Sequence, residues 1–198
     1  MTPLRSFVAA SAALLLVVSV RAEEGVSLAG KILPRQRVVA GTAFQLQGTA
    51  VLKAALFFDV YAAALYLGTN VPAARAMDDV PRRLEIHYLH DTPQSRMVRT
   101  AEETLARNLS PEQFAAVRER VARLHAAYAD GSRGGSATLT YIPGRGTEFA
   151  LNDTPRVLIE GADFAAAYFT VWLGDRPSSR SVKDQLLKGA LSPGKDTP

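Results

Sequence analysis

The sequence predicts one α+β domain in which a mainly antiparallel sheet and the helices come from separate parts of the chain. Alternating apolar segments separated by short turns occur in both halves of the sequence, as in hairpin-connected strands. Two consecutive helices with strong start signals stand between those segments. With 198 residues the chain is long enough for one sizeable core and short for two. Strands and helices segregated in this way are typical of the α+β class.

Residues 1–22 are predicted to be a secretory signal peptide. Arg5 provides a basic start, and an uncharged apolar run extends from Phe7 to Val20. Small residues at Val20 and Ala22 have the spacing of a cleavage site, so we expect cleavage after Ala22 and a periplasmic or secreted protein. The alternative is an uncleaved anchor, but the run is shorter than the about 20 residues that cross a bilayer. No stable membrane insertion is expected after cleavage.

The composition limits the classes of function. Without Arg5 and Arg21, 21 of the 23 basic residues remain against 19 acidic ones. The near balance gives no reason to expect a nucleic-acid partner, despite a sequence pI of about 9.6. The chain has no cysteine, which excludes disulfides, thiol nucleophiles and thiolate metal ligands.

The first half of the domain is predicted to be mostly strands. Val26–Gly48 contains a first strand and a hairpin, punctuated by glycine and proline. Leu52–Gly68 is predicted to be one long strand, because its even positions are almost all apolar. Its odd positions are mixed, which favours a core behind the strand and a cavity in front of it. A helical turn at Ala73–Met77 and a strand at Arg82–His90 follow.

The two central helices have the clearest signals. Thr92 is predicted to be the N-cap of a helix over Gln94–Arg107, with proline after it. Ser110–Gln113 has the pattern of a capping box. One apolar stripe runs along the second helix, at Phe114, Val117, Val121, Leu124 and Tyr128. Its arginines and glutamate, at Arg118, Glu119, Arg120 and Arg123, are expected to form a solvated face.

The second half returns to strands and ends in helices. The expected elements are strands at Ala137–Ile142, Thr147–Leu151 and Arg156–Ile159, then helices at Phe164–Leu173 and Val182–Lys188. The domain is assigned to residues 23–191, and a disordered tail to residues 192–198.

No catalytic or cofactor motif is present, and no metal or other cofactor is predicted. His87 and His90 would face opposite sides of a strand, so they cannot share a metal ion. The sequence has no nucleophile elbow, phosphate-binding loop or dinucleotide fingerprint. Gly144-Arg145-Gly146 has the composition of an anion-binding nest, but a tight turn explains it more simply. Glu102 and Glu103 are adjacent on a helix and do not face each other as a catalytic pair.

Several motifs resemble one known family. They are KAALFFDVYAAALYLG, IHYLHD before two helices, LTYIPGRGTEF, and FAAAYFTVWLG. Together they resemble the chalcone isomerase-like family, and more narrowly its exported bacterial branch, over roughly Gly30 to Gly189. The resemblance implies an open-faced β-sandwich, with a large antiparallel sheet covered on one face by helices and a ligand cleft between them.

The resemblance also implies which residues form the site. The family's key arginine falls on Lys53, the enzyme's strand threonine on Tyr61, and its catalytic tyrosine near Phe114, which has no hydroxyl. Flavanone synthesis is therefore not expected, because an ammonium lacks the bidentate grip of a guanidinium. The expected function is non-catalytic binding of a small apolar or amphipathic ligand such as a fatty acid. Lys53 would hold the anionic end, Tyr61 would donate a hydrogen bond, and Phe57, Phe114 and the helix from Phe164 would line the cleft.

Two alternatives remain open at this point. One is an isomerase, an intramolecular lyase of the chalcone isomerase type, acting on another substrate with Lys53 as the electrostatic group. The other is an interaction module whose cleft is filled by side chains. On an unbroken strand Lys53 and Tyr61 would be about 26 Å apart, so they serve one ligand only if the chain bends near Ala54-Ala55. A second interpretation is that Lys53 lies at a sheet edge, where its alkyl part covers apolar surface and its ammonium stays in water.

Overall fold

The computed structural model describes residues 25–54 and 58–189, and its main element is a seven-stranded antiparallel sheet. Each strand pairs with the next one along the chain, in the order β3-β4-β5-β6-β7-β8-β9. The strands are β3 Gln36–Val39, β4 Thr42–Ala54, β5 Phe58–Gly68, β6 Arg82–Tyr88, β7 Ser136–Ile142, β8 Gly146–Leu151 and β9 Thr154–Ile159. The predicted α+β class with an antiparallel sheet is confirmed.

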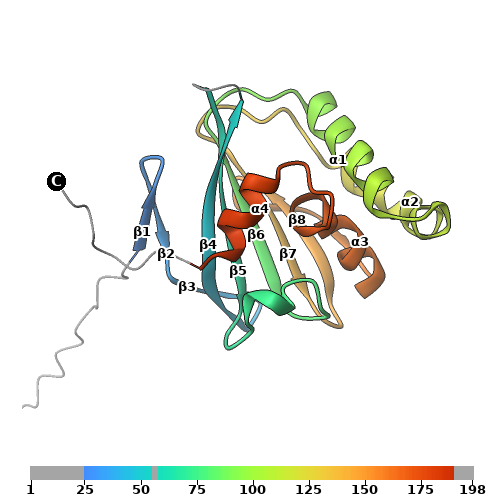
Figure 1. Ribbon diagram of the computed structural model, residues 1–198, viewed down its shortest axis with the longest axis horizontal. Coiled ribbons are helices and arrows are strands. Elements are labelled where there is room, and N and C mark those ends of the chain that lie inside the picture. Colours follow the sequence, from blue (N-terminus) through green and yellow to red (C-terminus); the bar gives the residue numbers. More distant parts are fainter. Residues whose placement is uncertain (1–24, 55–57, 190–198) are drawn as a thin grey trace, which may run out of the picture.

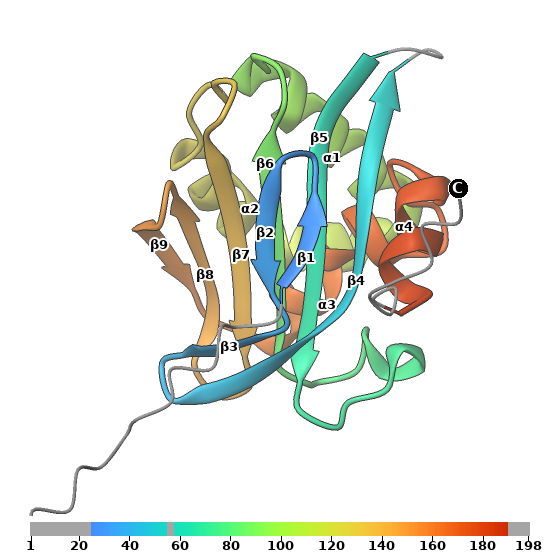
Figure 2. The same cartoon turned by 90° about the vertical axis from the view of Figure 1, so that its left-hand side faces the viewer.

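Helices cover one face of the sheet, and a small hairpin lies on the other (Figure 1, Figure 2). The helices are α1 Gln94–Asn108, α2 Pro111–Ala126, α3 Ala162–Leu173 and α4 Arg180–Leu187, with a 3-10 turn, η1 Ala73–Arg75, after β5. The hairpin consists of β1 Gly25–Leu28 and β2 Lys31–Pro34 and forms a separate two-stranded sheet. The sheet is thus the middle one of three layers.

The stretch Leu52–Gly68, predicted to be one long strand, is instead parts of two strands. β4 ends at Ala54, β5 begins at Phe58, and the two pair antiparallel, with Leu52 opposite Tyr61. The prediction was wrong because the apolar pattern continues through the reversal and no glycine, proline or asparagine marks a turn. The predicted separation of about 26 Å therefore does not apply.

Strand β5 is buried on both faces over most of its length. Ala63, Leu65 and Leu67 belong to the main core under the helices. Ala64 and Tyr66 belong to a second core under the β1–β2 hairpin. Alternating side chains reach opposite faces of a strand, so a central strand of a three-layer fold is apolar on both sides.

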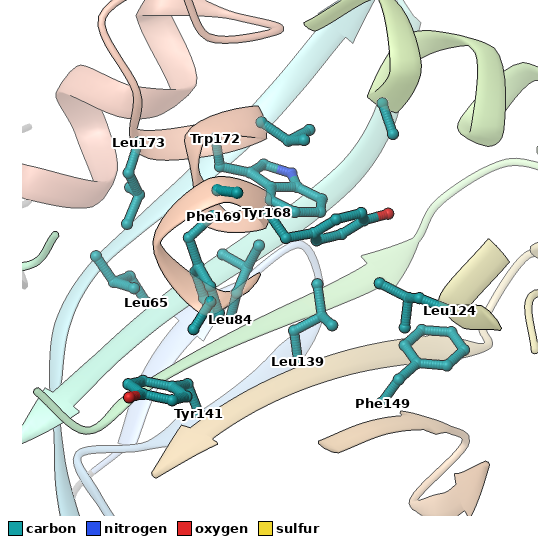
Figure 3. Packing of buried hydrophobic residues seen from close by; sticks show 14 of the residues in the cluster. Leu65, Leu84, Leu124, Leu139, Tyr141, Phe149, Tyr168, Phe169, Trp172 and Leu173 are labelled. Carbon is teal, nitrogen blue, oxygen red and sulfur yellow. The ribbon is translucent and has the colours of Figure 1, made fainter. Parts of the chain in front are cut away.

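The main core is built from cross-strand rows that α3 covers. Leu65, Leu84, Leu139 and Phe149 are successive partners across β5, β6, β7 and β8. Figure 3 shows Tyr168, Phe169 and Trp172 of α3 lying over this part of the sheet. Helix α4 lies against β4 at Gly48, where a Cβ would stand 2.3 Å from the carbonyl oxygen of Leu186. The close approach explains why this strand position has no side chain.

The two predicted helix starts had different outcomes. The capping box at Ser110 is confirmed, since its hydroxyl accepts from the Gln113 backbone and the Gln113 side chain accepts from the Ser110 backbone. Thr92 is not the N-cap of α1. It pairs with Gly131 in an isolated bridge, and the carboxylate of Asp130 accepts a hydrogen bond from the backbone of Gln94 at 2.8 Å. A residue 36 positions away supplies this cap, which a local pattern does not reveal.

The basic face of α2 is not simply solvated. The guanidinium of Arg120 makes two hydrogen bonds to the carboxylate of Asp163 in the first turn of α3, at 2.8 and 2.5 Å. It also donates to the carbonyl of Glu160. Arg120 therefore ties α2 to the start of α3 and helps to fix the helix that covers the core.

The two predicted terminal segments, residues 1–22 and 192–198, lie outside the described residues. Within 25–54 and 58–189, no helix is long and apolar enough to cross a membrane.

Candidate ligand-binding site

A cavity of about 180 Å³ lies between the sheet and the helices α1 and α3. The sheet contributes an apolar wall that includes Leu52, Tyr61, Leu84, Ile86, Leu139 and Phe149. The helices contribute Arg96, Met97, Thr100 and Ala101 from α1, and Val171 and Trp172 from α3. The wall residues on β5, β6, β7 and β8 belong to cross-strand rows of the helix-covered face, so the sheet register places them together.

Small side chains leave this space open. Ala101 of α1 and Ala137 of β7 line the cavity at positions where a larger apolar residue would fill it. The wall at Tyr88 depends on Gly131, because a Cβ there would stand 2.7 Å from a ring carbon of Tyr88. The hydroxyl of Tyr88 donates to the sulfur of Met97 at 3.2 Å, which joins this wall to α1.

Three tyrosines supply the phenol groups of the cavity wall. Burial raises the pKa of Tyr61 to about 12, and the Trp172 side chain partly offsets that shift. Burial also raises the pKa of Tyr88 to about 12. The pKa of Tyr128 is raised further by burial, while its hydrogen bond with Tyr168 acts in the opposite direction. All three phenols are therefore neutral near pH 7 and serve as uncharged hydrogen-bonding groups.

Arg96 is the only charged residue among the described residues that line the cavity. It stands in the first turn of α1 and is exposed, so it lies where the cavity meets solvent. Its guanidinium has no hydrogen bond or ion pair with any residue in the described part of the chain. The arrangement is an apolar cavity with neutral phenols in its wall and a cation at its edge.

The structure separates the four residues predicted for the site. Tyr61 lines the cavity. Lys53 does not, and its ammonium pairs with the carboxylate of Asp59 at 2.7 Å on the exposed end of the β4–β5 hairpin. Phe114 packs against the edge of the main core without lining the cavity. Phe57 lies outside the described residues.

The predicted set included the helix from Phe164, which contributes Val171 and Trp172 to the lining, but omitted Arg96, Tyr88 and Tyr128. One signal for Arg96 was available, because residues 96, 97, 100 and 101 occupy one face of a helix at spacings of three and four. Met97 and Ala101 are the apolar half of that face, and Arg96 and Thr100 are its polar half. Tyr88 ends β6 and Tyr128 follows the end of α2, and only the tertiary fold brings them together.

A family model described as chalcone isomerase-like matches residues 25–188. The chain belongs to the chalcone isomerase-like family. No curated protein matches the sequence. The match spans the seven-stranded sheet and helices α1 to α4, so the cavity described above lies inside the family domain.

A solved structure supports the fold of this chalcone isomerase-like protein. The fatty-acid binding protein AtFAP1 of Arabidopsis thaliana superposes with a TM-score of 0.62 at 14% sequence identity. The alignment covers 83% of this chain and 96% of that one. At this identity the likeness establishes the fold, while the chemistry of the site follows from the residues in the cavity.

Those residues differ from what the resemblance implied. Beside Tyr61 the neighbouring strand carries Leu52 rather than a cation. Among the described residues, no group of three or more histidine, aspartate or glutamate side chains is placed to hold a metal ion. The cavity of this chalcone isomerase-like protein is thus suited to apolar contact and neutral hydrogen bonding, with charge only at Arg96.

Proposed function

We propose that this protein binds a small apolar or amphipathic ligand, such as a fatty acid, in the cavity between the sheet and α1 and α3. The observation that carries the proposal is the lining itself, an apolar wall with a single exposed arginine at its edge. Ligand sites are typically apolar clefts with a few polar groups that fix orientation. The fold it shares with a fatty-acid binding protein supports the same conclusion.

The size of the cavity limits the ligand. A cavity of about 150 Å³ holds one benzene ring, whereas sites for drug-sized ligands measure about 300–1,000 Å³. At about 180 Å³ the cavity holds a small ring or part of an alkyl chain. We therefore favour a medium-chain amphiphile whose polar end remains at Arg96, where solvent has access.

Binding without catalysis is the better supported activity. General acid–base catalysis works best with a group whose pKa lies near the working pH. The phenols of Tyr61 and Tyr88 have pKa values raised to about 12 by burial, far from neutrality. The guanidinium of Arg96 has N–H donors and no acceptor, so it offers no base. The described lining residues therefore offer hydrogen bonds and a positive charge, and no base poised for proton abstraction near pH 7.

We also propose that the protein is exported, on the strength of the signal-peptide pattern in residues 1–22. Amino-terminal sequencing of the protein from the extracytoplasmic fraction of its host tests this. A mature start at Glu23 supports export, and retention of Met1 in a cytoplasmic fraction contradicts it.

The binding proposal has a direct optical test, because Trp172 is the only tryptophan of the chain and lines the cavity. Purified protein is stripped of lipid and titrated with dodecanoate while tryptophan emission is recorded. We expect a saturable change in intensity or wavelength, together with an increase in melting temperature. If neither signal changes up to the solubility limit of the probe, the proposal is wrong.

A further inference from the structure

A chain of polar contacts, two of them hydrogen bonds, connects the surface of the helical layer with the cavity wall. Nε2 of His125 on α2 lies 3.0 Å from the hydroxyl oxygen of Tyr168 on α3. That oxygen lies 2.6 Å from the hydroxyl oxygen of Tyr128, and Tyr128 is one of the residues that line the cavity. On the other side of the imidazole, Nδ1 lies 3.7 Å from a carboxylate oxygen of Glu102 on α1. The order is Glu102, His125, Tyr168, Tyr128 and then the cavity.

The inner members of this chain are enclosed. Tyr168 is fully buried and His125 is 7% exposed, whereas Glu102 is on the surface. Figure 3 shows the hydroxyl of Tyr168 directed toward the side of the core where Leu124 and Phe149 lie. The ring of Tyr128 lies against Phe149, with 4.8 Å between the ring centroids. These hydroxyls therefore have few partners besides one another.

The direction in which the protons point along the chain follows from Glu102. A carboxylate beside Nδ1 favours the tautomer with its proton on Nδ1, because a lone pair there would face a negative charge. In neutral His125 this leaves Nε2 as an acceptor. Tyr168 then donates to His125, and Tyr128 donates to Tyr168. Each phenol has one hydrogen atom, so the hydroxyl of Tyr128 has none left for the cavity.

Resting on the proposed function, we infer that the Tyr128 end of the cavity recognises a ligand hydroxyl or N–H group and disfavours a ligand carbonyl or ether. The oxygen of Tyr128 presents lone pairs to the ligand while its proton is committed to Tyr168. The ligand class is thus narrowed to an amphiphile with a hydrogen-bond donor at its buried end. A carbonyl oxygen brought to the same place would meet another acceptor, with no proton between them.

At and above pH 7 His125 is neutral, and in this state Tyr128 donates to Tyr168 and Tyr168 donates to His125. Desolvation lowers the pKa of His125 below its ordinary value, and the charge of Glu102 only partly opposes the shift. The pKa of Tyr168 is raised well above its ordinary value by burial and by the neighbouring Tyr128, so no phenolate interrupts the chain.

A matched pair of uncharged probes tests the inference without involving Arg96. 2-Decanol and 2-decanone have the same heavy atoms at the same positions, and only the alcohol donates a hydrogen bond. Affinities are measured at pH 8 through Trp172 emission and by calorimetry. We expect the wild-type protein to bind the alcohol about three- to tenfold more tightly than the ketone, the range of one net hydrogen bond.

Two variants test whether the preference depends on the direction of the hydrogen bonds rather than on how the side chains pack. Tyr168→Phe frees the proton of Tyr128, so we expect the affinity for 2-decanone to rise and the preference to fall to about one. Tyr128→Phe removes the acceptor, so we expect the affinity for 2-decanol to fall while that for the ketone is unchanged. The control Tyr66→Phe also deletes a buried hydroxyl, which donates to Pro34 on the opposite face of the sheet, and is expected to keep the wild-type preference.

The outcomes distinguish this inference from the proposed function. If dodecanoate binds but the wild-type protein takes 2-decanone as tightly as 2-decanol or more so, the inference is overturned and the proposed function stands. An unchanged preference in Tyr168→Phe, with its fold verified by thermal unfolding, overturns it as well. If neither dodecanoate nor the neutral probes bind, the proposed function fails and the inference fails with it.

Discussion

Leu52 of β4 stands directly opposite Tyr61 of β5, and both residues line the cavity between the sheet and the helices. The adjacent lysine, Lys53, pairs instead with Asp59 at the exposed end of the same hairpin. A shift of one residue along the strand therefore decides whether this site has an apolar or a cationic wall. In the observed register the apolar residue, Leu52, lies beside Tyr61 in the cavity wall.

The first prediction concerns the positive charge at the edge of the cavity. Arg96→Gln is expected to weaken dodecanoate binding by up to about fivefold, because an exposed ion pair contributes up to about 1 kcal/mol. Binding of 1-dodecanol is expected to stay the same. Calorimetric titrations of both probes at low and moderate salt measure the effect.

Arg99→Gln is the control for this variant, since Arg99 is exposed on the same helix and does not line the cavity. Equal losses in Arg96→Gln and Arg99→Gln would mean that the anion responds only to the general charge of α1.

The second prediction concerns the close packing of Gly131 on Tyr88. In Gly131→Ala the added Cβ would stand 2.7 Å from the Tyr88 ring, so the ring or the loop must move. We expect a loss of about 1–3 kcal/mol in the free energy of unfolding, the usual cost of overpacking, and weaker dodecanoate binding. Urea denaturation with Ser132→Ala, a change on the exposed part of the same loop, provides the comparison. A Gly131→Ala protein as stable as wild type would contradict the packing described here.

The third prediction concerns a buried carboxylate on the face of the sheet opposite the cavity. Glu85 is 2% exposed and lies 2.7 Å from both Arg37 and Arg83. Burial opposes its ionisation, but interactions with His87, Arg83 and Arg37 outweigh this and lower the pKa of Glu85. Glu85→Gln is expected to cost about 3–5 kcal/mol, because the buried guanidinium of Arg83 and the partly buried one of Arg37 lose their counter-charge.

The same group makes stability depend on pH with a definite sign. Because the folded pKa of Glu85 is below the unfolded value, its contribution is present above about pH 4.5 and is lost as the pH falls through the folded pKa. We expect the difference between wild type and Glu85→Gln in urea denaturation to shrink from pH 7 toward pH 3. Glu148→Gln, which breaks a more exposed pair with Arg145, is expected to cost at most about 1 kcal/mol. If the stability difference between wild type and Glu85→Gln were the same at pH 3 as at pH 7, the lowered pKa of Glu85 would be contradicted.

The fourth prediction concerns the pH dependence of ligand preference. Protonated His125 donates from Nε2, so Tyr168 then donates to Tyr128 and Tyr128 donates into the cavity. Since burial lowers the pKa of His125, the preference for 2-decanol over 2-decanone should persist down to about pH 6.5 and fall only below it. Tyr168→Phe is expected to show no such change. If the preference of the wild-type protein for 2-decanol over 2-decanone did not change with pH, the proposed reversal of the hydrogen bonds from His125 to Tyr128 would be contradicted.

The sequence revealed the fold class and most elements because their signals are local. The capping box at Ser110, for example, lies within a few neighbouring residues. The reversal between Lys53 and Asp59 was missed because its residues have strand-like composition. The N-cap of α1 was misassigned to Thr92 because the true acceptor, Asp130, is remote in sequence.

The candidate site was harder to predict than the fold. Tyr61 was identified through a family resemblance, and the structure does place it in the cavity wall. Arg96, Tyr128 and Trp172 come from three different segments, and their proximity depends on how α1 and α3 pack on the sheet. The same resemblance pointed to Lys53, yet its place outside the cavity follows from strand register, which one residue of slip reverses.

The most direct test of the cavity as the ligand site compares large side chains at two adjacent positions. Leu52→Trp places bulk in the cavity wall, and Lys53→Trp places the same bulk on the exposed end of the hairpin. Dodecanoate affinity is measured by calorimetry on both variants and on wild type, after thermal unfolding has shown that each is folded. We predict that Leu52→Trp loses at least about tenfold in affinity, or about 1.4 kcal/mol, while Lys53→Trp binds like wild type. Undiminished binding by Leu52→Trp, or loss of binding in Lys53→Trp alone, would contradict the account.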